Sequence, residues 1–313
     1  MIRNKLISFE MTLRNFLFLG LFILSISCQN RSRTEQQYQQ IVEEGYNLAI
    51  PNKDVQAVLI LFGGYPERAS DIKREFDIMD KAMNRGVAIL YSNFNQKIWL
   101  SENEIEALAL QMEQALKRHQ LPTSNVYIGG FSSGGNVALL LGNHLAANNE
   151  NERNANGVFL IDSPVDLVAL YQNAERNVKR DFSVVAMEES KWLLQKFGSS
   201  LGSPETSLEV YEKHSVVTLQ TSNISNLSQL KNVKLRLYTE PDSSWWKENR
   251  QADFEQTNAY QIQKLYELLK LRGFENTEYI PSQLKGYRAN GDRHPHSWSI
   301  VNQDDLLDWI LRS

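Results

Sequence analysis

The sequence contains a single cysteine, Cys28, and this scarcity excludes two classes of protein. One thiol cannot form an intramolecular disulfide, and a zinc module built on several cysteines is excluded as well. The sequence also lacks a large excess of positive or negative charge, since 33 basic and 37 acidic residues give a formal net charge of −4. We therefore expect no nucleic-acid partner.

A long apolar run is missing too. The apolar run at residues 16–24 is about half of the ~20 residues that a membrane-spanning helix needs. It follows three basic residues and leads through the small residues 25–27 into Cys28. This order is typical of a signal peptide, and small residues before a lone cysteine resemble a bacterial lipobox, in which the cysteine becomes lipidated. The alternative is an ordinary secretory signal with an incidental cysteine.

These features predict three segments. Residues 1–28 form a lipoprotein signal peptide, residues 29–44 form a polar, flexible tether, and residues 45–313 form the folded domain. We accordingly expect an exported protein, in the bacterial periplasm or at the cell surface, that is attached to a membrane through a lipid on Cys28.

The body of the chain alternates strand and helix patterns, which predicts an α/β fold with a mostly parallel sheet flanked by helices. Apolar runs predict strands at residues 55–62, 87–91, 126–131, 158–161, 233–238 and 277–280. Helical patterns occupy residues 71–85, 101–119, 134–147, 254–271 and 304–311. About 70 residues interrupt this alternation, and we expect a helical insertion at about 163–231, with helices at 167–180 and 184–197, that serves as a lid.

A candidate nucleophile lies between a predicted strand and a predicted helix. Gly130, Ser132 and Gly134 form a G-x-S-x-G motif at that junction. The glycines permit a tight, strained turn, and the helix N-terminus offers unpaired N–H groups to a developing negative charge. The sequence therefore predicts a nucleophile elbow centred on Ser132.

With this elbow the chain resembles the esterase- and lipase-like serine hydrolases of the α/β-hydrolase fold. The resemblance implies a catalytic triad in the chain order serine, acid, histidine, with no cofactor and no metal. It further implies an ester, thioester or amide substrate, either a small molecule or an acylated partner, that is cleaved through an acyl-enzyme on Ser132.

The resemblance places the catalytic base after the last predicted strand. Only His294 and His296 follow that strand, and His296 matches the family's usual ending of histidine, serine and an aromatic residue before a final helix. His294 remains the alternative. A rival interpretation takes Asp292 with both histidines as metal ligands, but an H-x-H pair is a weak signal by itself.

The same resemblance places the acid after the penultimate strand. Asp242 is the expected triad acid, and Glu240 is the alternative. Asp162, which ends the preceding strand, serves as the acid in variant hydrolases, or it caps the segment that follows it.

The oxyanion hole is expected to use the backbone N–H of Ser133 and an N–H from the loop after the first predicted strand, contributed by Gly64 or Tyr65. Trp245 and Trp246, near the expected acid, either line a substrate pocket or belong to ordinary packing. Two other functions stay open: an acyltransferase that uses the same triad, and a binding lipoprotein that keeps the fold without turnover.

Overall fold

The computed structural model describes residues 38–94, 97–147, 155–180 and 182–312, with only the backbone of residue 185. The predicted signal peptide, Cys28 and the tether up to residue 37 lie outside these ranges. Among the helices within these ranges, none combines the length and the apolar character that crossing a membrane requires.

Eight strands form one sheet in the order β1-β2-β4-β3-β5-β6-β7-β8. β1 pairs antiparallel with β2, and β2 antiparallel with β4, while every other neighbouring pair is parallel. The strands are β1 (Tyr38–Val42), β2 (Tyr46–Pro51), β3 (Ala57–Phe62), β4 (Val87–Ser92), β5 (Val126–Phe131), β6 (Ala155–Ile161), β7 (Lys234–Thr239) and β8 (Thr277–Pro281). The predicted mostly parallel α/β sheet is confirmed.

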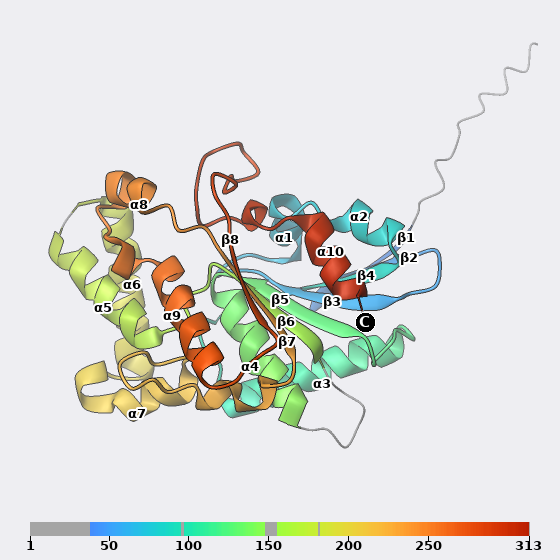
Figure 1. Ribbon diagram of the computed structural model, residues 1–313, viewed down its shortest axis with the longest axis horizontal. Helices are drawn as coiled ribbons and strands as arrows, with labels where there is room; N and C mark the ends of the chain where they lie inside the picture. The colour runs from blue at the N-terminus through green and yellow to red at the C-terminus, as the bar shows by residue number, and fades with distance from the viewer. Residues whose placement is uncertain (1–37, 95–96, 148–154, 181, 313) are drawn as a thin grey trace, which may run out of the picture. The chain divides into compact units, whose positions relative to one another are not determined.

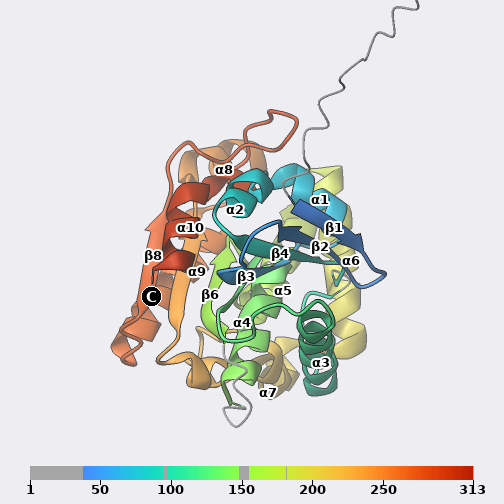
Figure 2. The same cartoon turned by 90° about the vertical axis from the view of Figure 1, so that its right-hand side faces the viewer.

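Helices cover both faces of this sheet (Figures 1 and 2). The helices described are α1 (Ala69–Glu75), α2 (Met79–Asn84), α3 (Glu102–Arg118), α4 (Ser133–Ala147), α5 (Leu167–Arg180), α6 (Val184–Ser200), α7 (Pro204–His214), α8 (Ser243–Arg250), α9 (Asn258–Leu271) and α10 (Gln303–Leu311). Short 3₁₀ helices lie at Ser225–Leu230, Phe254–Gln256 and Trp298–Ile300.

The alternating side chains of the buried strand β3 divide the core into two layers. Val58 and Ile60 belong to the apolar cluster that contains residues of α3, α4 and α9, whereas Leu59 and Leu61 belong to the cluster with residues of α1, α2 and α10. Successive side chains of a strand point to opposite faces, so a continuous apolar run is what a sheet covered on both faces requires.

The expected tether was placed too far into the chain. Residues 38–42, predicted as part of it, form β1, which pairs with β2 along its full length. Most side chains of β1 are exposed or only half-buried, so backbone pairing rather than apolar patterning defines this edge strand. The sheet therefore begins before residue 45.

The single helix expected at residues 71–85 is two helices. α1 ends before Phe76, whose side chain is 1% exposed and whose backbone leaves the helical region. The ring of Phe76 stacks on that of Trp298 at 5.0 Å, and α2 begins three residues later at Met79.

The expected insertion between β6 and β7 is helical. It consists of α5, α6, α7 and the 3₁₀ helix Ser225–Leu230, and the sequence patterns had indicated only α5 and α6. Its helices enclose a separate apolar cluster, in which Phe197 and Tyr211 stack at 5.6 Å between ring centroids. The insertion thus packs around a core of its own, beside the ends of the strands that carry the candidate site.

Candidate active site

Ser132 occupies a strained turn between β5 and α4. Its φ of +53° lies in the left-handed region, which is uncommon for a residue other than glycine. A Cβ on Gly130 would lie 2.1 Å from the carbonyl oxygen of Gly134, and a Cβ on Gly134 would lie 2.4 Å from that of Gly63. Both flanking positions therefore require glycine, as the predicted elbow demands.

His296 is held by Asp162. Nδ1 of His296 lies 2.7 Å from Oδ2 of Asp162, whose side chain is 3% exposed. Thr239 donates its hydroxyl to the other oxygen, Oδ1, at 2.6 Å, and the φ of Asp162 is +44°. The carboxylate is thus fixed by two polar contacts at the end of β6. Because Nδ1 donates to Asp162, Nε2 is the nitrogen of His296 that remains to accept a proton.

The expected pairing of Asp242 with His296 is not found. Asp242 accepts the backbone N–H of Trp245 at 3.0 Å as the N-cap of α8, and its other oxygen pairs with Arg293 at 2.5 Å. Both oxygens of Asp242 thus contact groups other than the imidazole. Asp162 takes the position that the sequence analysis assigned to Asp242.

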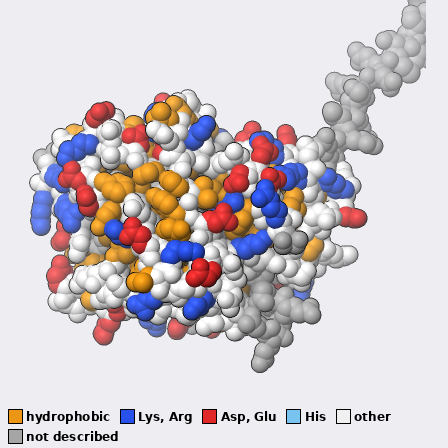
Figure 3. Space-filling view, viewed as in Figure 1, with side chains coloured by type: hydrophobic (Ala, Val, Ile, Leu, Met, Phe, Trp, Pro, Cys, Tyr) orange, Lys and Arg blue, Asp and Glu red, His pale blue; other side chains and the backbone are white. Residues whose placement is uncertain are grey.

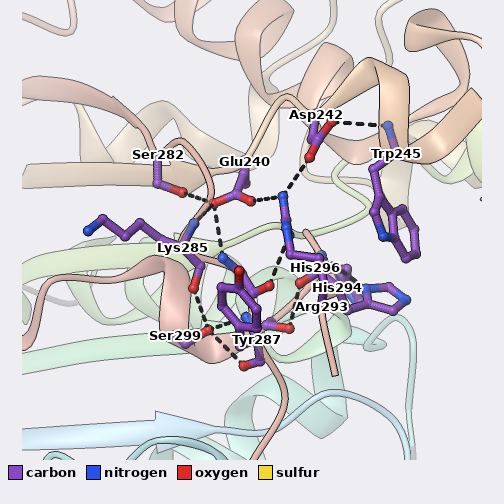
Figure 4. Close-up of polar contacts among 12 residues, drawn as sticks. Glu240, Asp242, Trp245, Ser282, Lys285, Tyr287, Arg293, His294, His296 and Ser299 are labelled. Carbon is purple, nitrogen blue, oxygen red and sulfur yellow. Dashed lines mark hydrogen bonds and ion pairs between the residues drawn. The ribbon is translucent and has the colours of Figure 1, made fainter. Parts of the chain in front are cut away.

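The alternative acid, Glu240, is not paired with His296 either. It is 1% exposed and accepts hydrogen bonds from the Ser282 hydroxyl at 2.8 Å and from the backbone N–H groups of Lys285 and Gly286 at 2.8 and 3.1 Å. Its second oxygen pairs with Arg293 at 2.5 Å. Figure 4 shows that Glu240 and Asp242 converge on Arg293, so both carboxylates fasten the loop that carries the histidines.

His294, the alternative base, lies in an aromatic setting. Its ring centroid is 4.5 Å from that of Trp245 and 5.8 Å from that of Trp246, and its Nδ1 accepts the backbone N–H of His296 at 3.2 Å. Burial, followed by the charges of His296 and the nearby arginines, lowers the pKa of His294 to about 3. No carboxylate in the described part of the chain holds this ring, which leaves His296 as the better placed base.

The loop after β3 approaches Ser132 closely, as expected of an oxyanion loop. A Cβ on Gly64 would lie 2.8 Å from Cβ of Ser132, so the backbone there needs glycine. The two expected donors in this loop are already engaged: Gly64 donates its N–H to Oε2 of Glu67 at 2.9 Å, and Tyr65 donates its N–H to Oγ of Ser133 at 2.9 Å. The N–H of Ser133 belongs to the first residue of α4, where no intrahelical acceptor exists.

The side chain of Glu67 holds this loop in place, and no sequence pattern had marked it as a site residue. Besides the Gly64 amide, its Oε2 accepts Nε1–H of Trp298 at 3.2 Å. Burial raises the pKa of the Glu67 carboxyl, against the lowering effect of these two hydrogen bonds. Nothing in its sequence context separates Glu67 from other loop carboxylates, since its partner Trp298 lies 231 positions away.

One cavity of about 390 Å³ brings the candidate residues together, and its lining includes Ser132, Ser133, Tyr65 and His296. The insertion closes part of it, because residues of α5 and α6 line the same space, and the ring of Trp192 stacks on that of Tyr65 at 4.8 Å. Trp246 lines the cavity, which is the first of the two roles considered for this pair. Trp245 is not among the lining residues and packs against His294. On the face shown in Figure 3, hydrophobic side chains gather toward the end of the molecule that carries α5 and α8.

The described residues do not assemble the alternative metal site. No group of three or more histidine, cysteine, aspartate or glutamate side chains within the described ranges could hold a metal ion. Asp292 accepts a hydrogen bond from the Asn290 side chain, and His296 uses Nδ1 for Asp162. The two histidines therefore contact different groups and do not converge on one point where a metal ion could bind.

No protein-family model matches the chain, and no curated protein matches it either. Solved structures do. A mutant of the esterase E40 matches with a TM-score of 0.54 at 14% identity, over 89% of this chain and 86% of that one. An esterase of the bacterial hormone-sensitive lipase family matches with a TM-score of 0.52 at 13% identity, over 88% of this chain and 85% of that one. A putative esterase from Staphylococcus aureus matches with a TM-score of 0.52 at 12% identity, over 88% of this chain and 80% of that one. Together with the strand order, these matches show the α/β-hydrolase fold.

Proposed function

We propose that the protein is a serine hydrolase whose catalytic triad is Ser132, His296 and Asp162. The observation that carries the proposal is the 2.7 Å contact between His296 and the buried Asp162, in a cavity that the strained Ser132 also lines. The three residues follow one another along the chain in the order serine, acid, histidine. This order and the elbow are what acyl transfer in this fold requires.

The geometry supports the following first half-reaction. Oγ of Ser132 attacks the carbonyl carbon of the substrate while its proton passes to Nε2 of His296. Asp162 keeps the imidazole in the tautomer that exposes Nε2 and stabilises the imidazolium that forms. Collapse of the tetrahedral intermediate breaks the bond to the leaving group, which takes the proton from His296 and departs as an alcohol, thiol or amine.

In the second half-reaction, water gives its proton to His296 and attacks the acyl-enzyme. The acid leaves, and the proton returns to Ser132. An alcohol in place of water would make the same triad an acyltransferase. Product analysis with alcohol acceptors distinguishes these outcomes, because transfer yields a new ester and hydrolysis yields a free acid.

Two backbone N–H groups are candidates to bind the developing oxyanion, and one of them must first give up its present hydrogen bond. The N–H of Ser133 stands at the start of α4, and the N–H of Tyr65 is given to the Ser133 hydroxyl at 2.9 Å. A charged oxyanion is a stronger acceptor than a hydroxyl oxygen, so it would displace Oγ of Ser133 from the Tyr65 amide. The engaged loop amides are also the observation that favours the second candidate, a binding protein of this fold without turnover.

Hydrolysis of short acyl esters by the fragment 38–313 separates the two candidates. The hydrolase proposal predicts release of acid that is lost in Ser132→Ala, while the neighbouring Ser133→Ala variant keeps measurable turnover. A folded protein that fails to cleave ester, thioester and amide members of one acyl series supports the binding protein instead.

We also propose that the protein is exported and anchored to a membrane through a lipid on Cys28. The proposal rests on the short apolar run and the small residues that precede this cysteine. Radiolabelled palmitate should be incorporated into the full chain, and Cys28→Ala should abolish the incorporation while Ser27→Ala retains it. Equal labelling of the Cys28→Ala variant, or no labelling of either chain, would refute the anchor.

A further inference from the structure

The cavity that contains Ser132 has a positively charged wall. Arg288 and Arg250 both line it, and Glu189 is the only carboxylate residue among the lining side chains of the described chain. The polar remainder of the lining includes the neutral amides Asn173, Asn177, Gln256 and Asn258. Asn173, Gln256 and Asn258 already form hydrogen bonds within the protein, so the two arginines are the groups of this wall that would gain most from an anionic ligand.

The backbone of Arg288 is held in place, and no carboxylate of the described chain forms an ion pair with its guanidinium. Its backbone N–H donates to the carbonyl of Asp292 at 2.9 Å, and its carbonyl accepts the N–H of Gly291 at 2.9 Å. Within the described ranges no side chain accepts a hydrogen bond from this guanidinium, although its charge acts at longer range on the buried Glu67 carboxyl and counters the rise in the pKa of that group. Arg293, on the same loop, differs from Arg288 in that it pairs with two carboxylates, Glu240 and Asp242.

The unpaired guanidinium lies close to the reacting groups. Cζ of Arg288 is 5.7 Å from the ring centroid of Phe131, whose ring is 4.4 Å from that of His296. Phe131 immediately precedes Ser132 in the chain. The ring of Phe131, the residue before the nucleophile, is therefore near both Arg288 and the base. Arg250, the second cation, lies over the ring of Trp245 at 5.6 Å, and its guanidinium donates, among the residues that the structure describes, only to the carbonyl of Asn249.

We propose that Arg288 binds an anionic group of the substrate, so that the protein acts on esters or amides that carry a negative charge, such as a carboxylate, near the scissile bond. A guanidinium donates two parallel hydrogen bonds to a carboxylate and loses less hydration than an ammonium, which makes arginine suited to this role. Arg250 adds a second positive charge to the same space. This inference rests on the proposed function, which supplies the scissile bond.

The test uses two pairs of esters that differ only in charge. Charge in the acyl part is compared with 4-nitrophenyl hexanoate and the 4-nitrophenyl monoester of adipic acid, which share a six-carbon chain. Charge in the leaving group is compared with phenyl butyrate and 4-carboxyphenyl butyrate. Binding of all four esters is measured by calorimetry on the Ser132→Ala variant, and turnover is measured on the protein with Ser132 intact.

We expect at least one charged ester to bind about 10- to 100-fold more tightly than its neutral counterpart. Arg288→Gln should remove that preference, and Arg272→Gln should retain it, because Arg272 is an exposed residue at the end of α9 and loses the same charge. Equal or weaker binding of both charged esters, or a preference that survives in Arg288→Gln, would overturn the inference.

The two proposals fail in different ways. Turnover of neutral and charged esters with equal kcat/KM leaves the hydrolase standing and refutes the anion site. Tight binding of a charged ester that depends on Arg288, without turnover by the protein with Ser132 intact, supports the anion site and refutes the hydrolase.

Discussion

Nδ1 of His296 lies 2.7 Å from Oδ2 of Asp162, the residue directly after β6. The carboxylates after β7, Glu240 and Asp242, are instead paired with Arg293. The candidate triad thus takes its acid from one strand, and the neighbouring strand supplies acids that hold the histidine loop.

Asp162→Asn should lower kcat by about 10⁴-fold. An amide in this position keeps the shape but favours the wrong imidazole tautomer and cannot stabilise the imidazolium. Steady-state kinetics with a short acyl ester would measure the effect, and thermal unfolding would show whether the variant remains folded.

Asp242→Asn is the matched control, because it makes the same chemical change at the expected but unpaired acid. It should lower kcat less than tenfold and reduce stability by no more than about 1 kcal/mol, because asparagine caps a helix as well as aspartate and only the ion pair with Arg293 is lost. A larger loss of kcat in Asp242→Asn than in Asp162→Asn would return the role of acid to Asp242.

His294 should make the protein sensitive to acid. Its pKa is lowered from 6.5 to about 3 in the folded state, so between these values the unfolded chain binds more protons than the folded one. The free energy of unfolding should therefore fall as the pH drops from 6.5 toward 3. Urea unfolding at pH 7 and pH 5 checks this: His294→Gln should show a smaller decrease than the unmodified chain. An unchanged decrease would contradict the buried, neutral histidine.

Glu67 should act as a positioning residue for the oxyanion loop. Glu67→Ala removes the acceptor for the Gly64 amide and for Trp298, and a displaced loop should lower kcat by up to about 100-fold with little change in KM. Glu67→Gln keeps an acceptor oxygen and should restore most of kcat. If the two variants lose kcat equally, Glu67 does not act by holding the Gly64 amide.

Arg293 should be important for stability. Removing it in Arg293→Met leaves the carboxylate of Glu240, 1% exposed, without its charged partner, which should cost about 3–5 kcal/mol. The double variant Arg293→Met with Glu240→Gln removes the buried charge as well and should recover part of the loss in urea unfolding. A double variant as unstable as the sum of both single variants would show that the two residues are not coupled.

The sequence was sufficient for the parts of the site that depend on local patterns. The G-x-S-x-G motif identified the turn at Ser132, because the crowding at Gly130 comes from Gly134, only four residues away; the crowding at Gly134 comes from Gly63 and is not a local signal. Buried strands such as β3 and β5 were predicted because they lie between two helical layers and must be apolar throughout. The edge strand β1 escaped because pairing with β2, rather than burial, defines it.

The acid could not be chosen from the sequence. Asp162, Glu240 and Asp242 all follow a strand that ends at the same edge of the sheet, so local pattern allows any of them. What decides between them is the position of Arg293, 51 residues beyond Asp242 in the chain. The engaged state of the Tyr65 amide depends likewise on Ser133, 68 residues away.

We propose above that Ser132 is a nucleophile that His296 and Asp162 activate. The most direct test of this proposal is mass spectrometry of the folded protein after treatment with a fluorophosphonate probe. We expect a single adduct on the peptide that contains Ser132. It should be absent in Ser132→Ala and form far more slowly in His296→Gln and in Asp162→Asn. A folded protein that stays unlabelled, or one whose adduct persists in Ser132→Ala, would contradict the proposal.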